Sequence, residues 1–520
     1  AMVLHQFLEY FAREHPQQPC MEYGDAHFTY HQVNAHCNQM AHAFLDSNLT
    51  KGDRVAWLSK NCIEQMQCFY AGSKVGVVTT PLNYRLAPPE WAYIINDCQA
   101  KVLVCEQELA AGIDKIREQL EYVEHFICLD GPRENWQEFA LWIEGHPAEN
   151  PAVNIDASDV LYQMYTSGTT GLPKGAILSQ RAIEQNVRMI SCQIAMTVLE
   201  ARFLLVMPLY HAGAGIALKS TISHGGCIVL HREFDPAAVV NDFETKAITN
   251  CTLVPAMIQA CLVAVPDIAE RKFPQLKVIG YGASPIAEET LRTALNVFGC
   301  DFAQAFGMTE TTAIATLLSP DAHRRALAGE PHLLLSCGRA ALGTEVRIVD
   351  KDDNELPRGE IGEVAIKGPQ LMDGYWNLPE ATASSLRGGW MYTGDAGRMD
   401  DEGFLYIEDR IKDMIVSGGE NIYPKEVENA LFNHPNVADA AVIGIPSDQW
   451  GETVMAFIAT KDGQDIPADE IISFCREQLA GYKVPRTVEC IAQIPRNASG
   501  KILKKDLREP FWQGVERRVG

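Results

Sequence analysis

The sequence lacks the cysteine patterns of a disulfide framework and of a structural zinc site. Its 15 cysteines are scattered singly between Cys20 and Cys490, none forms a C-x-x-C pair, and no group of cysteines and histidines has the spacing of zinc ligands. An odd number of isolated thiols is typical of an enzyme kept in a reducing compartment. We therefore expect free cysteines and a cytoplasmic location.

Long apolar runs are missing as well. The longest apolar-biased stretch, Cys251–Pro266, is interrupted by Thr252, Pro255 and Gln259, and it is too short to span a bilayer. The first residues, AMVLHQFLEYFAREHP, lack the basic start and the small-residue cleavage site of a signal peptide. We expect no transmembrane segment, and we leave open peripheral contact with a membrane and a homodimer.

Basic residues are scarce, because 44 Lys and Arg face 67 Asp and Glu and the formal net charge is −23. Phosphate backbones are bound through surplus Lys and Arg, so we expect no nucleic-acid partner. The residues from Gly481 to the end are an exception, with nine basic and four acidic side chains. This locally positive segment suits a small anionic ligand.

The pattern of apolar residues predicts a mixed α/β fold. No repeat and no low-complexity tract is present, which excludes solenoids and propellers. Up to about residue 330, short β-branched runs alternate with longer helical ones, as in RVAWLSK before IEQMQCFYAGSKVG. This alternation indicates βαβ units on mainly parallel sheets. Between residues 338 and 409, short segments with Asp, Asn and Gly turns indicate a small barrel-like β subdomain.

At 520 residues the chain is long enough for several structural units. We predict a large N-terminal domain over residues 1–409, with βαβ-type sheets and the β subdomain, and a small mobile α+β C-terminal domain over residues 410–520. The boundary is placed at DRIKD, Asp409–Asp413, because a self-contained α+β pattern follows it. In that pattern Pro424 is expected to open a helix, and DAAVIGI and TVMAFIA to form strands.

The run YTSGTTGLPKG, Tyr165–Gly175, combines glycines, hydroxyls and one lysine in a way that suits a phosphate cradle. It is not a Walker A loop, because Pro173 precedes Lys174 and a glycine follows it, so that the Gly-Lys step and the Mg-binding hydroxyl are missing. Its glycine spacing also differs from the Rossmann fingerprint. A strand-to-helix loop remains that could hold and release a polyphosphate through Thr166, Ser167, Thr169, Thr170 and Lys174. A polar surface loop explains the same composition equally well.

A resemblance decides between these interpretations. In order along the chain follow PLYHAGAG, GYGASP, FGMTE, GEIGEVAIKG, YTGD, DRIKDMIVSGGENIYP and PRNASGK. Together with Tyr165–Gly175, they make essentially the whole chain similar to the adenylate-forming, AMP-binding enzymes, and within these to acyl-CoA synthetases and aryl-CoA ligases. The resemblance implies ATP, Mg²⁺ and coenzyme A, with the loop holding the β- and γ-phosphates that leave as pyrophosphate.

The resemblance also implies a nucleotide site. It assigns Mg²⁺ to Thr166 and to Glu310, whose carboxylate is a ligand that this hard cation accepts. Phe306 stands where Tyr is more usual, which keeps adenine stacking and removes a hydroxyl contact. Gly280 and Tyr281 are expected to line the acyl pocket. The other implied nucleotide contacts are Gly168, Gly282, Ala283, Ser284, Gln304, Ala305, Gly307, Met308 and Thr309.

Four further residues are given roles by resemblance. His211 borders the carboxylate site, next to small residues that leave room beside it. Asp395 binds the ribose hydroxyls, and Arg410 lies nearby. Lys501 bridges the substrate carboxylate and the α-phosphate, where an ammonium offsets the repulsion of two anions.

The resemblance further implies that the C-terminal domain changes orientation between the steps, with Lys412 as the hinge. In the second orientation Gly418 and Gly419 line the pantetheine channel. Trp450, Lys483 and Arg486 are expected contacts of coenzyme A.

We predict an ATP-dependent, AMP-forming carboxylic acid–CoA ligase that works through an acyl-adenylate. A medium- or long-chain fatty acid is favoured and an aryl acid of the benzoate or cinnamate type comes next, because small residues after His211 suit an extended pocket whereas Tyr281 could shorten it. An acyl-AMP ligase that loads a carrier protein and an oxygen-using luciferase stay open. A non-catalytic nucleotide-binding module is disfavoured by the joint presence of Thr166, Glu310, Asp395 and Lys501.

Overall fold

The computed structural model describes residues 2–166, 172–194, 196–282, 286–418, 420–479, 481–496 and 501–515. The chain divides into two compact units. Unit 1 comprises residues 1–166, 173–345 and 366–391, and unit 2 comprises residues 167–172, 346–365 and 392–520. Among the described residues, no helix is long and apolar enough to cross a membrane. The boundary expected at Asp409–Asp413 stays a prediction.

One sheet of unit 1 has the order β16-β15-β14-β13-β12-β10-β11-β1-β2. From β14 to β1 neighbouring strands run parallel, and the pairs at both ends are antiparallel. Its strands are β1 (Pro19–Tyr23), β2 (Ala26–Thr29), β10 (Arg202–Leu205), β11 (Cys227–Leu230), β12 (Asn250–Thr252), β13 (Val278–Tyr281), β14 (Asp301–Phe306), β15 (Thr316–Leu318) and β16 (Arg339–Ala340).

Another sheet of unit 1 has the order β19-β9-β8-β4-β3-β5-β6-β7. It is parallel from β8 to β7, whereas β8, β9 and β19 pair antiparallel. Its strands are β3 (Arg54–Leu58), β4 (Val78–Pro81), β5 (Val102–Cys105), β6 (His125–Cys128), β7 (Gln137–Glu138), β8 (Val160–Tyr165), β9 (Gly175–Ser179) and β19 (Gly374–Tyr375).

Helices of unit 1 cover both sheets, and several begin at a side-chain cap that the sequence supplies. Ser179 accepts a hydrogen bond from the Ala182 N–H at the start of α7, and Asp235 caps α9 just before a proline at its first position. The helices are α1 (Leu4–Glu14), α2 (Tyr30–Asp46), α3 (Ile63–Val75), α4 (Pro88–Asp97), α5 (Gln107–Ile116), α6 (Phe139–Ile143), α7 (Gln180–Gln193), α8 (Ala212–Ser223), α9 (Pro236–Thr245), α10 (Pro255–Ala264), α11 (Glu288–Phe298), α12 (Pro320–Leu327) and α13 (Pro379–Ser385).

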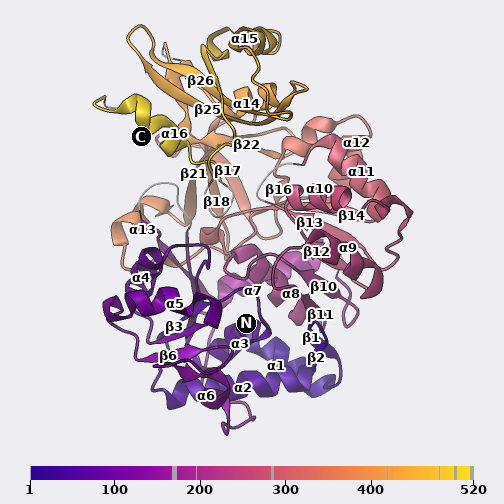
Figure 1. The fold of residues 1–520 in the computed structure, drawn as a ribbon, viewed down its shortest axis with the longest axis vertical. Coiled ribbons are helices and arrows are strands. Elements are labelled where there is room, and N and C mark those ends of the chain that lie inside the picture. Colours follow the sequence, from indigo (N-terminus) through magenta and orange to yellow (C-terminus); the bar gives the residue numbers. More distant parts are fainter. Residues whose placement is uncertain are drawn as a thin grey trace. The chain divides into compact units, whose positions relative to one another are not determined.

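A hydrophobic core between the two sheets joins them through α1, α3, α7 and α8 (Figure 1). Phe69 and Tyr162 come from the α3 and β8 side, and Leu205 and Ile228 from β10 and β11. Helices α3 and α8 are buried almost all round, as expected for helices packed between two layers. This packing holds α8, which follows His211, in a fixed place against β8.

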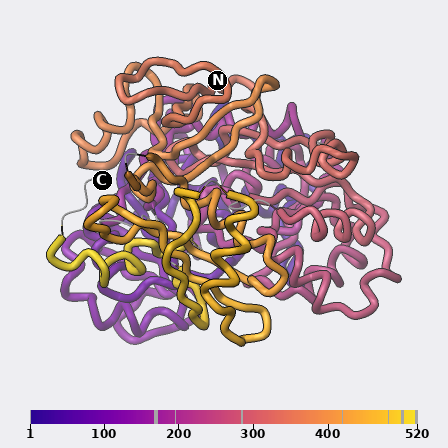
Figure 2. The backbone as a smooth tube through the Cα atoms, turned by 90° about the horizontal axis from the view of Figure 1, so that it is seen from above, coloured from indigo at the N-terminus to yellow at the C-terminus, as the bar shows by residue number. Residues whose placement is uncertain are grey.

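Unit 2 contains most of a sheet with the order β17-β18-β21-β20, in which β22 also pairs with β21, and a second sheet, β24-β23-β26-β25, in which β27 pairs with β26. The orange-to-yellow end of the tube in Figure 2 follows this second sheet and its helices. The elements are β17 (Glu345–Val349), β18 (Gly362–Lys367), β20 (Leu386–Arg387), β21 (Trp390–Met399), β22 (Leu405–Arg410), β23 (Ile415–Ser417), β24 (Glu420–Ile422), α14 (Pro424–Phe432), β25 (Val437–Ser447), β26 (Gly451–Thr460), α15 (Ala468–Arg476), β27 (Thr487–Cys490) and α16 (Lys504–Trp512).

The predicted mixed α/β class, with sheets in a large N-terminal part and antiparallel strands in a small C-terminal part, is confirmed. The helix opened by Pro424 and the strands at DAAVIGI and TVMAFIA are also confirmed, as α14, β25 and β26.

Candidate active site

The ends of the Tyr165–Gly175 loop are held together by strand pairing. Tyr165 on β8 pairs with Gly175 on β9, the Thr166 N–H donates to the Lys174 carbonyl at 2.9 Å, and the Lys174 N–H donates to Thr166 Oγ1 at 3.3 Å. The expectation of a strand-to-helix loop is therefore wrong. Residues 175–179 continue the sheet as β9, and the chain enters a helix only at Gln180.

Buried polar contacts anchor the β8 end of this loop. The Tyr165 hydroxyl donates to Asp97 Oδ2 at 2.5 Å and accepts from Gln163 Nε2 at 3.1 Å, and Arg54 donates to Gln163 Oε1. Burial, together with Asp97, raises the pKa of Tyr165, so its hydroxyl stays a donor. Tyr165, the residue before Thr166, is thus held in place by Asp97 and Gln163.

Glu310 is buried close to the same loop end. Its Oε1 accepts a hydrogen bond of 2.9 Å from the Tyr375 hydroxyl, and its carbonyl accepts one from the Met372 N–H at 2.8 Å. The Lys174 Nζ lies 5.5 Å from the centroid of the Tyr375 ring. Tyr375 belongs to β19, which pairs with β9 just after Lys174. Tyr375 therefore connects the loop with Glu310, and sequence reasoning missed it.

The segment that leads from β14 to Glu310 makes a close turn. Gly307 is required there, because a Cβ at that position would overlap the backbone oxygen of Ala313. Thr312, just after the turn, has a φ of 69°, and its hydroxyl donates to the carbonyl of Gln370 at 2.6 Å. The expected nucleotide contacts Ala305, Phe306, Met308 and Thr309 lie on or near the end of β14, and none is fully buried.

Two expected nucleotide contacts lie where β13 and β14 end side by side. Tyr281 pairs with Gln304, which is buried, and the Gln304 Oε1 has no hydrogen-bond partner among the residues that the structure describes. Gly282 follows β13, and a Cβ there would lie 3.0 Å from the Ala305 carbonyl oxygen. A buried amide oxygen without a partner suits a ligand that donates a hydrogen bond.

The expected acyl-pocket residues come from two different elements. His211 precedes α8, and its ring lies 4.5 Å from that of Tyr210. Gly280 and Tyr281 lie on β13, and the Tyr281 hydroxyl is 2.7 Å from His323 Nε2. His323 Nδ1 is 2.7 Å from the Ser319 carbonyl, so that Nδ1 donates there and Nε2 accepts from Tyr281.

Some predicted site residues lie outside the described residues. These are Ser167, Gly168, Thr169, Thr170, Ala283, Ser284 and Gly419. Their assignment stays a prediction from resemblance.

In unit 2, Asp395 and Arg410 face each other across the β21–β22 pair. Arg410 Nε lies 3.2 Å from Asp395 Oδ1, and Arg410 Nη1 donates to the Thr393 carbonyl at 3.2 Å. The turn between these strands contains Gly403, which has a φ of 87° and whose N–H donates to the Asp400 carbonyl. The Asp395 carboxylate, which is expected to bind the ribose, is thus paired with Arg410.

Lys412 lies in a short 3-10 turn, Ile411–Asp413, after β22, and burial lowers its pKa. The next residue, Asp413, forms an ion pair of 2.7 Å with Arg508 of α16. The residue directly after the proposed hinge, Asp413, is therefore ion-paired with the C-terminal helix α16.

Lys501 and Lys504 lie three residues apart in different surroundings. Lys501 is exposed and follows residues 497–500, which are outside the description, whereas Lys504 is buried with its Nζ 2.8 Å from Glu428 Oε1 and 3.6 Å from Asp409 Oδ2. Burial alone lowers the pKa of Lys504, but Asp409 and Glu428 raise it above its usual value. Burial raises the pKa of Asp409 to about 6, against the effect of Lys504.

The expected coenzyme A contacts Gly418, Trp450 and Arg486 lie together. The Gly418 N–H donates to the Trp450 carbonyl at 2.9 Å, and the Arg486 guanidinium lies 5.1 Å from the centroid of the indole. Gly418 has a φ of 58°, and a Cβ there would lie 3.0 Å from the indole. Lys483 instead pairs with Glu426 at 2.9 Å.

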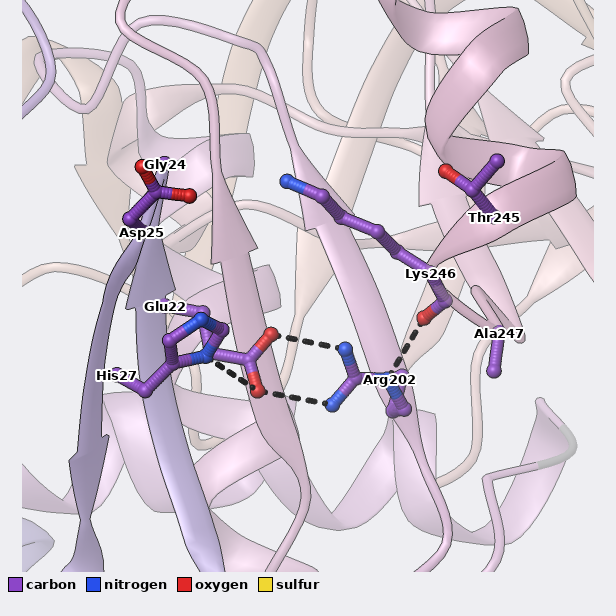
Figure 3. Close-up of a pocket in the computed structure, with 8 residues that line it drawn as sticks. All are labelled: Glu22, Gly24, Asp25, His27, Arg202, Thr245, Lys246 and Ala247. Carbon is purple, nitrogen blue, oxygen red and sulfur yellow. Dashed lines mark hydrogen bonds and ion pairs between the residues drawn. The ribbon is translucent and has the colours of Figure 1, made fainter.

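A polar cleft of about 490 Å³ lies elsewhere in unit 1 and contains none of the predicted site residues (Figure 3). Two hydrogen bonds between Arg202 and Glu22 cross it, and His27 lies 3.3 Å from Glu22. Glu22, Arg202 and His27 thus interact with one another in this cleft.

Two models of one enzyme family match the chain. Residues 8–376 match the model of the AMP-binding enzyme family, and residues 426–501 match the AMP-binding enzyme C-terminal domain. A fatty acid–[acyl-carrier-protein] ligase of Streptomyces coeruleorubidus is 35% identical over 99% of this chain and 97% of that protein. A feruloyl-CoA synthase of Amycolatopsis sp is 35% identical over 96% of this chain and 97% of that protein.

The fold has a solved counterpart. The structure of a Mycobacterium tuberculosis fatty acyl CoA synthetase has a TM-score of 0.79 and 33% identity, covering 99% of each chain. The class defined by the fold and the family models is that of the AMP-forming acyl-CoA ligases. The chain belongs to the AMP-binding enzyme family.

Proposed function

We propose that this enzyme joins a medium- or long-chain fatty acid to coenzyme A through an acyl-adenylate. The acid's carboxylate attacks the α-phosphorus of ATP and pyrophosphate leaves. The thiol of coenzyme A then attacks the acyl carbon, the bond to the phosphate oxygen breaks, and AMP leaves. Neither step requires a covalent bond to the protein, so the side chains position groups and stabilise charge.

The observation that carries this proposal is the network Thr166–Lys174–Tyr375–Glu310. It places an ammonium, a hydroxyl and a buried carboxylate at one end of the loop. Hydroxyl and carboxylate oxygens fit Mg²⁺, which keeps waters and uses few protein ligands. Thr166 and Glu310 would hold the ion, which when bound neutralises the charge of the phosphates. Among the described residues, no group of three or more His, Cys, Asp or Glu side chains is placed so that it could hold a metal ion.

The remaining predicted residues are given roles in this sequence of steps. Asp395, fixed by Arg410, would bind the ribose, and His211 would border the carboxylate. Lys501 would bridge the carboxylate and the α-phosphate while the adenylate forms. Gly418 and Trp450 would contact coenzyme A in the second step, after a turn at Lys412.

Aryl acids are the second candidate, because a feruloyl-CoA synthase is as similar to this chain as a fatty acid ligase is. Transfer to a carrier protein is a third, supported by the name of the first of these relatives. Both alternatives leave the adenylation site unchanged and differ in the acyl pocket or the acceptor. A cytoplasmic location remains part of the proposal, and a homodimer stays open.

The deciding experiment measures pyrophosphate and AMP release from ATP with a panel of fatty and aryl acids, with coenzyme A, with a phosphopantetheinylated carrier protein, or with neither. We expect pyrophosphate release with medium- or long-chain acids and AMP release that depends on coenzyme A. Release that depends on the carrier protein alone would contradict the proposed acceptor.

A further inference from the structure

Asn61 lies between β3 and α3, and its side chain serves a distant part of the chain. An asparagine beside the start of a helix ordinarily caps that helix. The N-cap of α3 is Cys62, however, and the Asn61 amide bonds to residues that lie 146 to 170 positions later. Asn61 is 3% exposed, so these bonds form out of contact with water. The amide therefore connects the end of β3 with the other sheet of unit 1.

The Asn61 amide binds two backbone groups of one short segment, Met207–Leu209. Its Nδ2 donates to the Met207 carbonyl at 2.9 Å, and its Oδ1 accepts from the Leu209 N–H at 2.9 Å. In an extended chain these two groups point to the same side, so one amide can bind both, as a residue of a neighbouring parallel strand would. The backbone of Met207–Leu209 is thus fixed on this side although it lies beyond the end of β10.

The same amide also reaches the chain that leaves β11. Strands β10 and β11 pair in parallel up to Leu205 and Leu230, and the His231 N–H still donates to the Leu205 carbonyl at 2.9 Å. Beyond that point Asn61 Nδ2 donates to the His231 carbonyl at 3.2 Å. Asn61 therefore bridges the two segments after their strand pairing ends. This is the carboxyl end of parallel strands, where open α/β sheets bind ligands.

The segment held by Asn61 leads directly to His211. The His211 N–H donates to the Pro208 carbonyl at 3.0 Å, and His211 is the N-cap residue of α8. The Tyr210 ring lies 4.5 Å from the His211 ring and 5.5 Å from the ring of Tyr84, which follows β4. The turn from which Tyr210 and His211 project is thus built on backbone that Asn61 fixes.

We propose that Asn61 is a positioning residue for the acid substrate, which acts by holding the turn that carries Tyr210 and His211. The inference rests on the proposed function, in which His211 borders the carboxylate of the acid. Loss of the amide leaves two buried carbonyls and one N–H without their partner, and the segment shifts to satisfy them. A displacement of about 1 Å at a substrate-positioning group can cost about 10²-fold in rate.

Asn38 on α2 provides the matched comparison within unit 1. Its side chain is as well buried, at 1% exposed. Its Nδ2 donates to the Ala148 carbonyl at 2.7 Å and to Asn150 Oδ1 at 2.9 Å. These partners lie between α6 and β8, in a stretch that contains none of the predicted site residues. Asn38 therefore holds a loop by the same kind of bond without leading to His211.

The test measures initial rates of pyrophosphate release with the best acid of the panel, varying the acid and ATP in turn. Asn61→Ala should lower kcat/KM for the acid by about 10–10²-fold, mainly through a higher KM for the acid. The KM for ATP should stay within about twofold of the wild-type value, because Tyr165 and Glu310 are anchored by other contacts. An unchanged KM for the acid, with kcat normal or reduced, would overturn the inference, since partial unfolding removes active enzyme and alters neither KM.

Asn61→Asp is a second variant of the same size, which keeps the acceptor for the Leu209 N–H but directs an oxygen at the carbonyls of Met207 and His231. It should raise the KM for the acid at least as much as Asn61→Ala does, because repulsion replaces two hydrogen bonds. The control Asn38→Ala should leave the KM for the acid within about twofold of the wild-type value. An equal rise in Asn38→Ala would show that general loosening of unit 1 explains the effect, and would contradict the role of Asn61.

A failure of the proposed function is recognised in the unaltered enzyme. If no acid of the panel releases pyrophosphate from ATP with the wild type, the ligase activity itself is misassigned, and the role of His211 falls with it. If the wild type is active and both Asn61 variants keep its KM for the acid, only the positioning role of Asn61 is refuted.

Discussion

Unit 1 and unit 2 position their key charged groups in opposite ways. Glu310 is buried, tied to Tyr375 and enclosed by the turn at Gly307. Lys501 is exposed, whereas Lys504, three residues later, is buried and paired with Glu428. A group that serves a ligand throughout the reaction benefits from a fixed place, whereas a group used in one step has to leave afterwards. We therefore propose that Glu310 is a permanent part of the site and that unit 2 delivers Lys501 for one step.

The largest expected effect concerns the anchor of Lys501. Lys504→Met leaves Asp409 and Glu428 buried without their cation, so unit 2 should lose about 3–5 kcal/mol of stability. Denaturant unfolding followed in both units measures it. Lys505→Met, at the exposed neighbouring position, is the control and should change stability by less than about 0.5 kcal/mol. Equal stabilities of the two variants would mean that the buried cluster does not anchor this segment.

Next in size is the loss of the fixed carboxylate. Glu310→Gln can still accept the hydrogen bond from Tyr375 but has no charge, so adenylation should fall by about 10²–10³-fold, or ~3–4 kcal/mol. Glu310→Ala should be at least as poor and should also weaken ATP binding. The control is Glu289→Ala on the exposed side of α11. Normal pyrophosphate release by Glu310→Gln at ordinary Mg²⁺ would remove this carboxylate from the site.

The comparison between the units is sharpened at the proposed hinge. Lys412→Pro fixes φ and removes a backbone donor, so one orientation of unit 2 should be favoured. One half-reaction should then fall by up to about 10²-fold more than the other, because misplacement of the catalytic group has that scale of effect. Single-turnover rates of the two steps measure the difference. Equal losses, or none, would place the hinge elsewhere.

The smallest expected effect lies inside unit 1 and concerns two buried histidines. Burial lowers the pKa of His5 and of His323 to about 4. Both are neutral in the folded protein but take up a proton in the unfolded chain below about pH 6.5, so unit 1 loses stability as the pH falls from 6.5 toward 4. His323→Gln should reduce that loss by about 2 kcal/mol, whereas His31→Gln, at an exposed position, should not. An unchanged pH dependence of urea unfolding in His323→Gln would contradict this.

Much of the fold could be predicted because local patterns and strand pairing agree. The alternation of apolar runs located β3 and α3. The loop that starts at Thr166 was located, but the element after it was not. GAILS is short and apolar, and only its pairing with β8 and β19 shows it to be a strand.

The missed site residue, Tyr375, depends on a pairing between distant parts of the chain. Tyr375 reaches Glu310 because β19 joins the edge of a sheet whose other strands lie about two hundred residues earlier or more.

The central claim, that unit 1 holds the nucleotide while unit 2 delivers Lys501 for adenylation alone, is tested most directly by Lys501→Ala in separate half-reactions. Starting from acid and ATP, the variant should form adenylate about 10²–10³-fold more slowly than the wild type. Supplied with pre-made acyl-adenylate and coenzyme A, it should form the thioester at close to the wild-type rate. An equal loss in both half-reactions would show that Lys501 serves both steps or is structural. That result would contradict the claim that unit 2 delivers Lys501 for adenylation alone.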